Sequence, residues 1–308
     1  MDPKHQSGTP DSHPLKRDTG FDLGVQEALF GDALPVPVRK KKKRVRPVEI
    51  PLHSARKALL VAEYLRLFIF VTKHGTYIDG FAGPQSESMD QPGTWSARLV
   101  LENEPKWLRH FHLFDLGDLQ IQRLKRLRKE LGDGRDIQIY SGDFNDEVLK
   151  VLTPGIIGKK EATFALLDQR CFECKWSTVE RLADYKRPRI ELLYFLAEGW
   201  LDRSLASATR DPKLEQIEAW WGRSDVEKVR AVTGVARANL FCERFRELGY
   251  QHVAPWAIQG EDETGTKRTM YFLIHASDHD EAPKFMRRAY NKMVLPRAMQ
   301  MQTTLRLS

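Results

Sequence analysis

The sequence predicts an α/β protein with a doubly wound, mostly parallel sheet that ends in an antiparallel hairpin. Short apolar runs alternate with segments of helical spacing from residue 54 to residue 196. A mostly helical stretch follows, up to residue 248, and then two strand-like runs joined by a polar turn. Repeated strand–helix units give parallel strands, whereas a short polar turn gives an antiparallel pair.

The individual elements follow from local patterns. A first helix is expected from Ser54, because apolar residues such as Leu60, Tyr64 and Phe68 recur at helical spacing. A basic amphipathic helix is expected at 119–131, closed by Gly132. The other predicted helices are 95–102, 145–152 and 177–185, and the predicted strands are 76–80, 111–115, 137–141, 163–168, 190–196, 251–259 and 268–275.

Composition and length bound the domain organisation. Residues 1–48 are rich in Pro, Gly, Asp and Ser and are expected to form a disordered tail. Residues 49–295 are expected to form the folded domain, with a helical insertion at about 198–248, and residues 296–308 a C-terminal tail. With 308 residues, 41% of them hydrophobic, the chain is long enough for one large domain with an appendage.

The net charge of +7 favours an anionic partner. The tail contributes a dense basic run that we predict to contact nucleic acid through phosphate groups: Arg39, Lys40, Lys41, Lys42, Lys43 and Arg44. The alternative is a solvated linker that aids solubility. The chain lacks a signal-like or membrane-length apolar run, so we expect a cytoplasmic protein with no membrane partner.

The three cysteines and the histidines predict no metal site. Cys171 and Cys174 have C-x-x-C spacing, but a zinc site needs a second pair of ligands, and the sequence offers none. Free cysteines around a buried turn are the simpler interpretation. The pair Trp220–Trp221 has two interpretations, stacking on a base or capping the core, and we favour the core.

The segment Tyr77-Ile78-Asp79-Gly80-Phe81-Ala82-Gly83-Pro84 reads as a strand that ends in an acid and a glycine loop. Such a loop seats a nucleotide-type cofactor at the carboxyl end of the first strand of an open α/β sheet. It is neither G-x-G-x-x-G nor a Walker loop, and it resembles the first motif of S-adenosylmethionine-dependent methyltransferases. We therefore predict that Asp79, Gly80, Phe81 and Gly83 bind this cofactor.

Acidic residues also mark the ends of the next strands. Asp115 is expected to accept from the ribose hydroxyls, and Asp143, followed by Phe144, to contact the adenine amine. Asp168 ends the fourth strand, next to the transferred group. A single aspartate there means little, because Asp favours turns, but four aspartates in register indicate a nucleoside-type ligand.

The predicted acceptor site follows the fourth strand. A polar carbonyl from Asp168 or Gln169 would orient an acceptor nitrogen for in-line attack, so both are candidate catalytic residues. Arg170 and Arg203 are candidate substrate contacts for a phosphate or carboxylate. The alternatives are an exposed surface arginine for Arg170, and a salt bridge to Asp202 or another neighbour for Arg203.

Four segments together resemble the three-Cys-motif partner family: 77–84, 166–169, 200–203 and 273–277. The resemblance covers about residues 54–294. It implies a bacterial or phage methyltransferase-like domain of the class I Rossmann type, which binds S-adenosylmethionine. It also implies a partner protein with a three-cysteine motif similar to radical S-adenosylmethionine enzymes.

The leading hypothesis is a methyltransferase-like protein that binds S-adenosylmethionine and acts on or with nucleic acid. One alternative is a non-catalytic partner subunit, consistent with Gln85 and Arg170 where family members usually have a glycine and an aromatic residue. Another is a nucleic-acid binding module with a vestigial cofactor pocket.

Overall fold

The computed structural model describes residues 52–84, 93–170, 172–198, 201–207, 213–261 and 267–295. All of them belong to the second of the two units into which the chain divides, residues 47–308. The predicted basic run at 39–44 and the C-terminal tail lie outside the described residues, as do Gln85 and Cys171.

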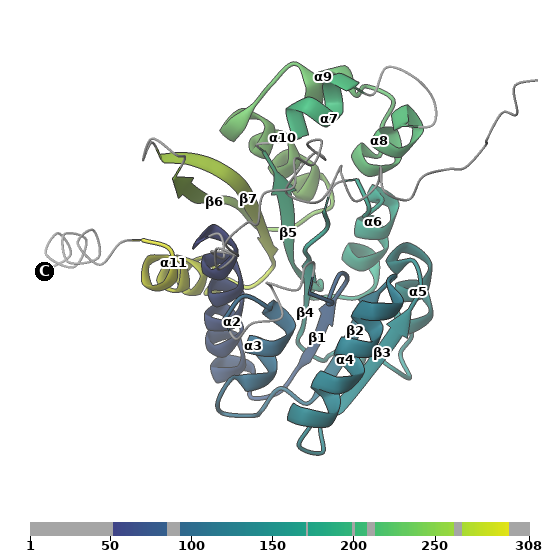
Figure 1. The fold of residues 1–308 in the computed structure, drawn as a ribbon, viewed down its shortest axis with the longest axis vertical. Helices are drawn as coiled ribbons and strands as arrows, with labels where there is room; N and C mark the ends of the chain where they lie inside the picture. The colour runs from purple at the N-terminus through teal and green to yellow at the C-terminus, as the bar shows by residue number, and fades with distance from the viewer. Residues whose placement is uncertain are drawn as a thin grey trace, which may run out of the picture. The chain divides into compact units, whose positions relative to one another are not determined.

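Seven strands form one sheet in the order β3-β2-β1-β4-β5-β7-β6 (Figure 1). Strands β1 to β5 pair in parallel, whereas β7 is antiparallel to both β5 and β6. The strands are β1 (Thr76–Asp79), β2 (His110–Asp115), β3 (Asp136–Ser141), β4 (Thr163–Leu167), β5 (Glu191–Ala197), β6 (His252–Glu261) and β7 (Lys267–Ser277). This is the strand order of class I methyltransferases, so the predicted fold class is confirmed.

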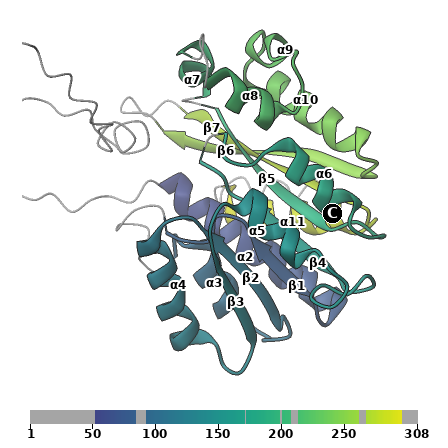
Figure 2. The same ribbon diagram turned by 90° about the vertical axis from the view of Figure 1, so that its right-hand side faces the viewer.

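Helices cover both faces of this sheet. On one face α2 packs against both α11 and α3, and α3 packs against α4. Helices α5 to α10 pack on the other, with α7 to α10 gathered near β5 and β7 (Figures 1 and 2). The helices are α2 (Leu52–Thr72), α3 (Ser96–Glu102), α4 (Asp118–Leu131), α5 (Phe144–Val151), α6 (Trp176–Asp184), α7 (Leu201–Ser207), α8 (Lys213–Trp221), α9 (Glu227–Arg230), α10 (Gly234–Glu247) and α11 (Ala282–Met293).

The strands divide their side chains between the two layers by simple alternation. In β4, Phe164 and Leu166 pack with α2, α3 and α4, whereas Ala165 and Leu167 face the opposite layer. All four are fully buried. Successive residues of a strand point to opposite faces, so the continuous apolar run in β4 marks a strand covered on both sides.

This packing decides between the two interpretations of the Trp220–Trp221 pair and adds a helix that the sequence did not predict. Trp220 and Trp221 are buried in the core of the α5–α10 layer, where both rings lie against Phe241, so the core interpretation is confirmed. Helix α11 was not among the predicted elements. It begins with Pro283 in its first turn and buries Ala282, Met286 and Ala289 next to α2.

Within the described part, no helix is both long and apolar enough to cross a membrane. The described residues also contain no group of three or more His, Cys, Asp or Glu side chains that could hold a metal ion.

Candidate functional site

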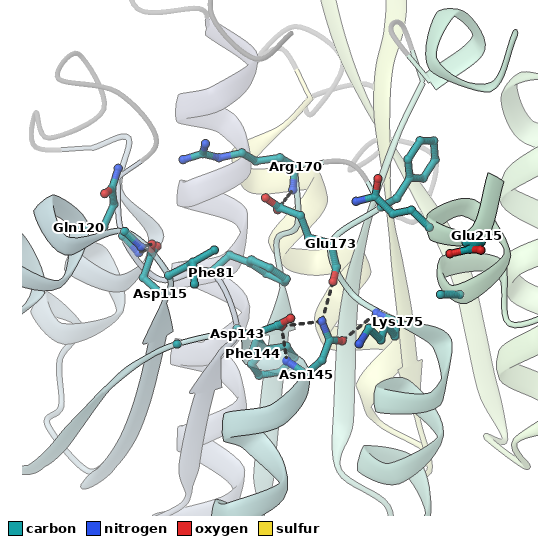
Figure 3. A pocket seen from close by; sticks show the side chains of 18 residues that line it. Phe81, Asp115, Gln120, Asp143, Phe144, Asn145, Arg170, Glu173, Lys175 and Glu215 are labelled. Atoms are coloured by element: carbon teal, nitrogen blue, oxygen red, sulfur yellow. Dashed lines mark hydrogen bonds between the residues drawn. The ribbon is translucent and has the colours of Figure 1, made fainter. Parts of the chain in front are cut away.

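A cavity of about 690 Å³ opens at the carboxyl ends of β1, β2 and β3 (Figure 3). Its volume lies within the range of about 300–1,000 Å³ that small-molecule sites occupy. Asp115 and Glu215 lie on opposite sides of it, with Asp143 and Asn145 between them. Among the residues predicted to bind a cofactor, six line this cavity: Gly80, Phe81, Gly83, Asp115, Asp143 and Phe144.

The glycine loop after β1 packs too closely against its neighbours for side chains at two positions. A Cβ on Gly83 would lie 2.4 Å from Cβ of Gln120 and 2.6 Å from Oδ2 of Asp115. A Cβ on Gly80 would lie 3.1 Å from the Phe144 ring. Because glycine has no Cβ, the loop backbone lies directly beside the β2 and β3 ends and leaves the cavity open.

Asp115 holds this loop in place. Its Oδ2 accepts a 3.0 Å hydrogen bond from the Gly83 N–H, and its Oδ1 accepts a 3.0 Å bond from the Gly117 N–H. A carboxylate has about four lone-pair sites, so each oxygen keeps one acceptor position beyond its backbone bond. The carboxylate therefore both fixes the loop and presents acceptor capacity to the cavity.

Asp143 caps the N-terminus of α5. Its Oδ1 accepts from the backbone N–H of Asn145 at 2.9 Å and from the Asn145 side-chain amide at 2.7 Å. No described residue other than Asn145 donates to the Asp143 carboxylate, so Oδ2 is available to a donor in the cavity. An amine of a ligand is such a donor.

Asn145, which the sequence analysis did not single out, connects Asp143 to the loop after β4. Its amide donates to the Glu173 carbonyl at 2.8 Å, and its Oδ1 accepts from the Lys175 N–H and from the Thr178 hydroxyl. Asn145 is buried, so it fixes the position of this loop relative to α5. An asparagine after a strand-end aspartate is a common turn pattern, so the sequence alone did not identify its role.

The far wall of the cavity comes from the loop after β4 and from α8. Arg170 lies here, and its N–H donates a 2.8 Å hydrogen bond to Glu173 Oε2 (Figure 3). Burial raises the pKa of Glu173 despite that bond. The other lining residues of this wall are Phe172, Lys175, Glu215, Gln216 and Ala219.

Acidic side chains outnumber basic ones around the cavity. Asp115, Asp143, Glu173 and Glu215 line it, against the two cations Arg170 and Lys175. A ligand with a net positive charge therefore matches it better than one that carries phosphates.

Asp79 lies beneath the loop rather than on the wall of this cavity. The Tyr77 hydroxyl donates to it at 2.8 Å, and the Phe81 N–H donates at 3.2 Å. Burial raises the pKa of Asp79 to about 7, and the nearby charge of Asp168 adds to the effect. Asp79 and Asp168 line a separate small hollow behind the loop.

The two candidate catalytic residues are engaged inside the protein. Asp168 accepts from Lys57 Nζ of α2, at 2.8 Å on Oδ1 and 2.7 Å on Oδ2. The Lys57 ammonium also lies 4.8 Å from the ring centre of Phe195 and 5.7 Å from that of Tyr271. Gln169 is buried, and its Oε1 accepts from the Cys174 N–H at 2.9 Å.

Arg203 belongs to α7, but its side chain lies outside the described part of the structure. Its neighbour Asp202 pairs with Arg237 at 2.6 Å. Cys174 is a free, buried thiol, and burial raises its pKa well above the ordinary value.

Comparisons with known proteins give no sequence relative. No family model matches the chain, and no curated protein resembles it in sequence. Solved structures with a similar fold include an O-methyltransferase from Bacillus cereus in complex with SAH, with 11% identity over 75% of this chain and 93% of that chain, at a TM-score of 0.42. Another is M. jannaschii TYW2 in complex with AdoMet, with 10% identity over 74% and 77%, at a TM-score of 0.38. A human methyltransferase 10 domain containing protein has 11% identity over 83% and 93%, at a TM-score of 0.39. At these TM-scores the fold assignment rests on the strand order itself.

Proposed function

We propose that this chain binds S-adenosylmethionine in the 690 Å³ cavity and acts as a methyltransferase on or with nucleic acid. One observation carries the cofactor proposal. Six residues chosen from the sequence as cofactor contacts line a single cavity at the carboxyl edge of a sheet with the class I methyltransferase order.

The residues around the cavity fit this cofactor. Gly80 and Gly83 leave room for a ligand against the loop backbone, and Asp115 offers acceptor positions to vicinal hydroxyls. Oδ2 of Asp143 offers an acceptor position to an amine of the ligand. The excess of carboxylates suits a sulfonium cofactor, which when bound supplies an electrophilic methyl group.

The nucleic-acid part of the proposal is supported by charge. The run Arg39–Arg46 contains seven cations in eight residues, and phosphate neutralisation by such a run adds affinity without sequence preference. A three-cysteine partner similar to radical S-adenosylmethionine enzymes is proposed from the sequence resemblance alone.

Two measurements test the proposal. Titration calorimetry with S-adenosylmethionine should show saturable binding, with weaker binding by Asp115→Asn. Incubation with methyl-labelled cofactor and bulk DNA or RNA should then transfer label to nucleic acid. Absence of heat with the wild-type chain would contradict the cofactor proposal, and heat without transfer would favour the alternative below.

The alternative is a non-catalytic subunit that keeps the cofactor site. The ion pair between Lys57 and Asp168 favours it, because both oxygens of the strand-four carboxylate already bind an ammonium of the same chain. An acceptor nitrogen would have to displace Lys57 to reach Asp168.

A further inference from the structure

The two helical layers of the protein differ in charge. Helices α4 and α11, at the two ends of one layer, carry nine Lys and Arg residues and only the acids Asp118 and Glu130: Arg123, Lys125, Arg126, Arg128, Lys129, Lys284, Arg287, Arg288 and Lys292. In the opposite layer, α5, α6 and α8 carry three cations, Lys150, Arg181 and Lys213, against six acids: Asp146, Glu147, Glu180, Asp184, Glu215 and Glu218.

The cations of α4 form a stripe on its outer side. Lys125, Arg126 and Lys129 are exposed, and Lys129 follows Arg126 by three residues and Lys125 by four. Ile121, Leu124 and Leu127 face the core. Within the described ranges, none of the three has an ion-pair partner. The acid beside them, Glu130, is paired with Arg98 at 2.5 Å.

Helix α11 repeats this arrangement at the other end of the layer. Arg287 and Arg288 are exposed and have no ion-pair partner among the described residues, whereas Lys284 pairs with Glu281 and Lys292 with Glu63. Since α11 packs on α2, α2 on α3, and α3 on α4, both stripes belong to one continuous layer (Figures 1 and 2).

The unpaired cations indicate a ligand of high negative charge density. Helix α4 has 14 residues and is therefore about 21 Å long. Duplex DNA carries one phosphate charge per about 1.7 Å of its axis, more than any single strand offers over the same length. The first turn of α4 also reaches the cofactor cavity through Gln120, so a duplex along α4 passes the cavity mouth.

We propose that the outer face of α4, with Lys125, Arg126 and Lys129 at its centre, is a docking surface for the phosphate backbone of duplex DNA, extended by Arg287 and Arg288 of α11. The surface deepens the proposed function, since it assigns the nucleic-acid contact to the folded domain in addition to the basic run at 39–44. It requires no bound cofactor.

The test uses the full chain and a short labelled DNA duplex, titrated by fluorescence anisotropy at several salt concentrations without cofactor. The triple variant Lys125→Gln, Arg126→Gln, Lys129→Gln should bind more weakly at low salt. The slope of log affinity against log salt should become shallower by up to about 2.7, at roughly 0.9 for each lost contact. The double variant Arg287→Gln, Arg288→Gln should make the same slope shallower by up to about 1.8.

The matched control is Lys150→Gln, Arg181→Gln, Lys213→Gln, which removes the same charge from the opposite layer. It should leave the slope close to that of the wild type. An equal loss in the control would show that only net charge matters and would overturn the proposal, as would an unchanged slope in the α4 variant.

Two further outcomes would also overturn it: tighter binding of vesicles with anionic lipids than of the duplex, or complete loss of DNA binding on deletion of residues 1–48 alone. Thermal unfolding checks that the variants are folded. Calorimetry with S-adenosylmethionine is run separately, so a chain that binds DNA but no cofactor refutes the proposed function and leaves this surface intact.

Discussion

The two halves of the sheet's carboxyl edge use their acids differently. At β2 and β3, Asp115 and Asp143 are held by backbone N–H groups or by a neighbouring amide, and both line an open cavity. At β4, Asp168 is held by the side-chain ammonium of Lys57, from a helix 111 residues earlier in the sequence. Backbone bonds orient a carboxylate and leave it charged, whereas an ion pair also neutralises it.

The carboxylates at the ends of β2 and β3 can therefore accept from a ligand, whereas the carboxylate at the end of β4 is already occupied by Lys57. The glycines of the β1 loop allow its backbone to lie close to Asp115 and Phe144, because they have no Cβ. At the end of β4, where the methyl acceptor is predicted to bind, the rings of Phe195 and Tyr271 already contact the Lys57 ammonium of the same chain. Four changes test the contrast, beginning with the largest expected effect.

Lys57→Met should destabilise the fold by about 3–5 kcal/mol, because it leaves the Asp168 carboxylate buried without its counter-charge. Chemical denaturation measures the loss. The double variant Lys57→Met, Asp168→Leu should recover most of it, since no unpaired charge remains. A single variant as stable as the wild type would show that the ion pair does not form.

Asp115→Asn should weaken S-adenosylmethionine binding by about 1.5–3 kcal/mol, the range for a hydrogen bond to a charged group. The amide also places an N–H donor where the Gly83 or Gly117 N–H now donates. Calorimetry measures the change, with Asp136→Asn, at an exposed position of β3, as the control. Equal affinity of the two variants for the cofactor would show that Asp115 does not contact it.

Gly83→Ala should lower the free energy of unfolding by about 1–3 kcal/mol, the usual cost of overpacking, because its Cβ would overlap Gln120 and Asp115. The displaced loop should also bind the cofactor more weakly. The same titration tests it. Gly155→Ala is the matched control, because no atom lies within 4 Å of a Cβ at that position. If both variants bind like the wild type, the loop is not the cofactor cradle.

The smallest expected effect is a pH dependence of the free energy of unfolding that comes from Asp79. Its folded-state pKa of about 7 lies above the ordinary value of 3.8, so the folded state binds the proton more tightly. The resulting stability is present below about pH 4 and is lost as the pH rises through about 7. The free energy of unfolding of the wild type, relative to Asp79→Asn, should therefore fall between about pH 4 and pH 7. A constant difference would contradict the raised pKa.

Much of the architecture was contained in local sequence. The strand ends at Asp79, Asp115 and Leu167 agree with the sequence prediction within one residue, because apolar runs and turn residues are local signals. The hairpin of β6 and β7 was predicted because a polar turn, and not a helix, joins the two strands. The core position of Trp220–Trp221 was predicted from their large apolar side chains. Helix α11 was not predicted, although its buried residues recur at helical spacing.

The sequence by itself determined the sheet and the half of the site made by consecutive residues at strand ends, since parallel strands bring those ends to one edge. Only the tertiary structure decided the rest. The wall from α8 and the partner of Asp168 depend on where distant helices pack, and no local periodicity encodes that choice. The charge difference between the two layers is likewise not apparent along the chain, because the basic helices α4 and α11 join one layer, at its two ends, only after the sheet forms.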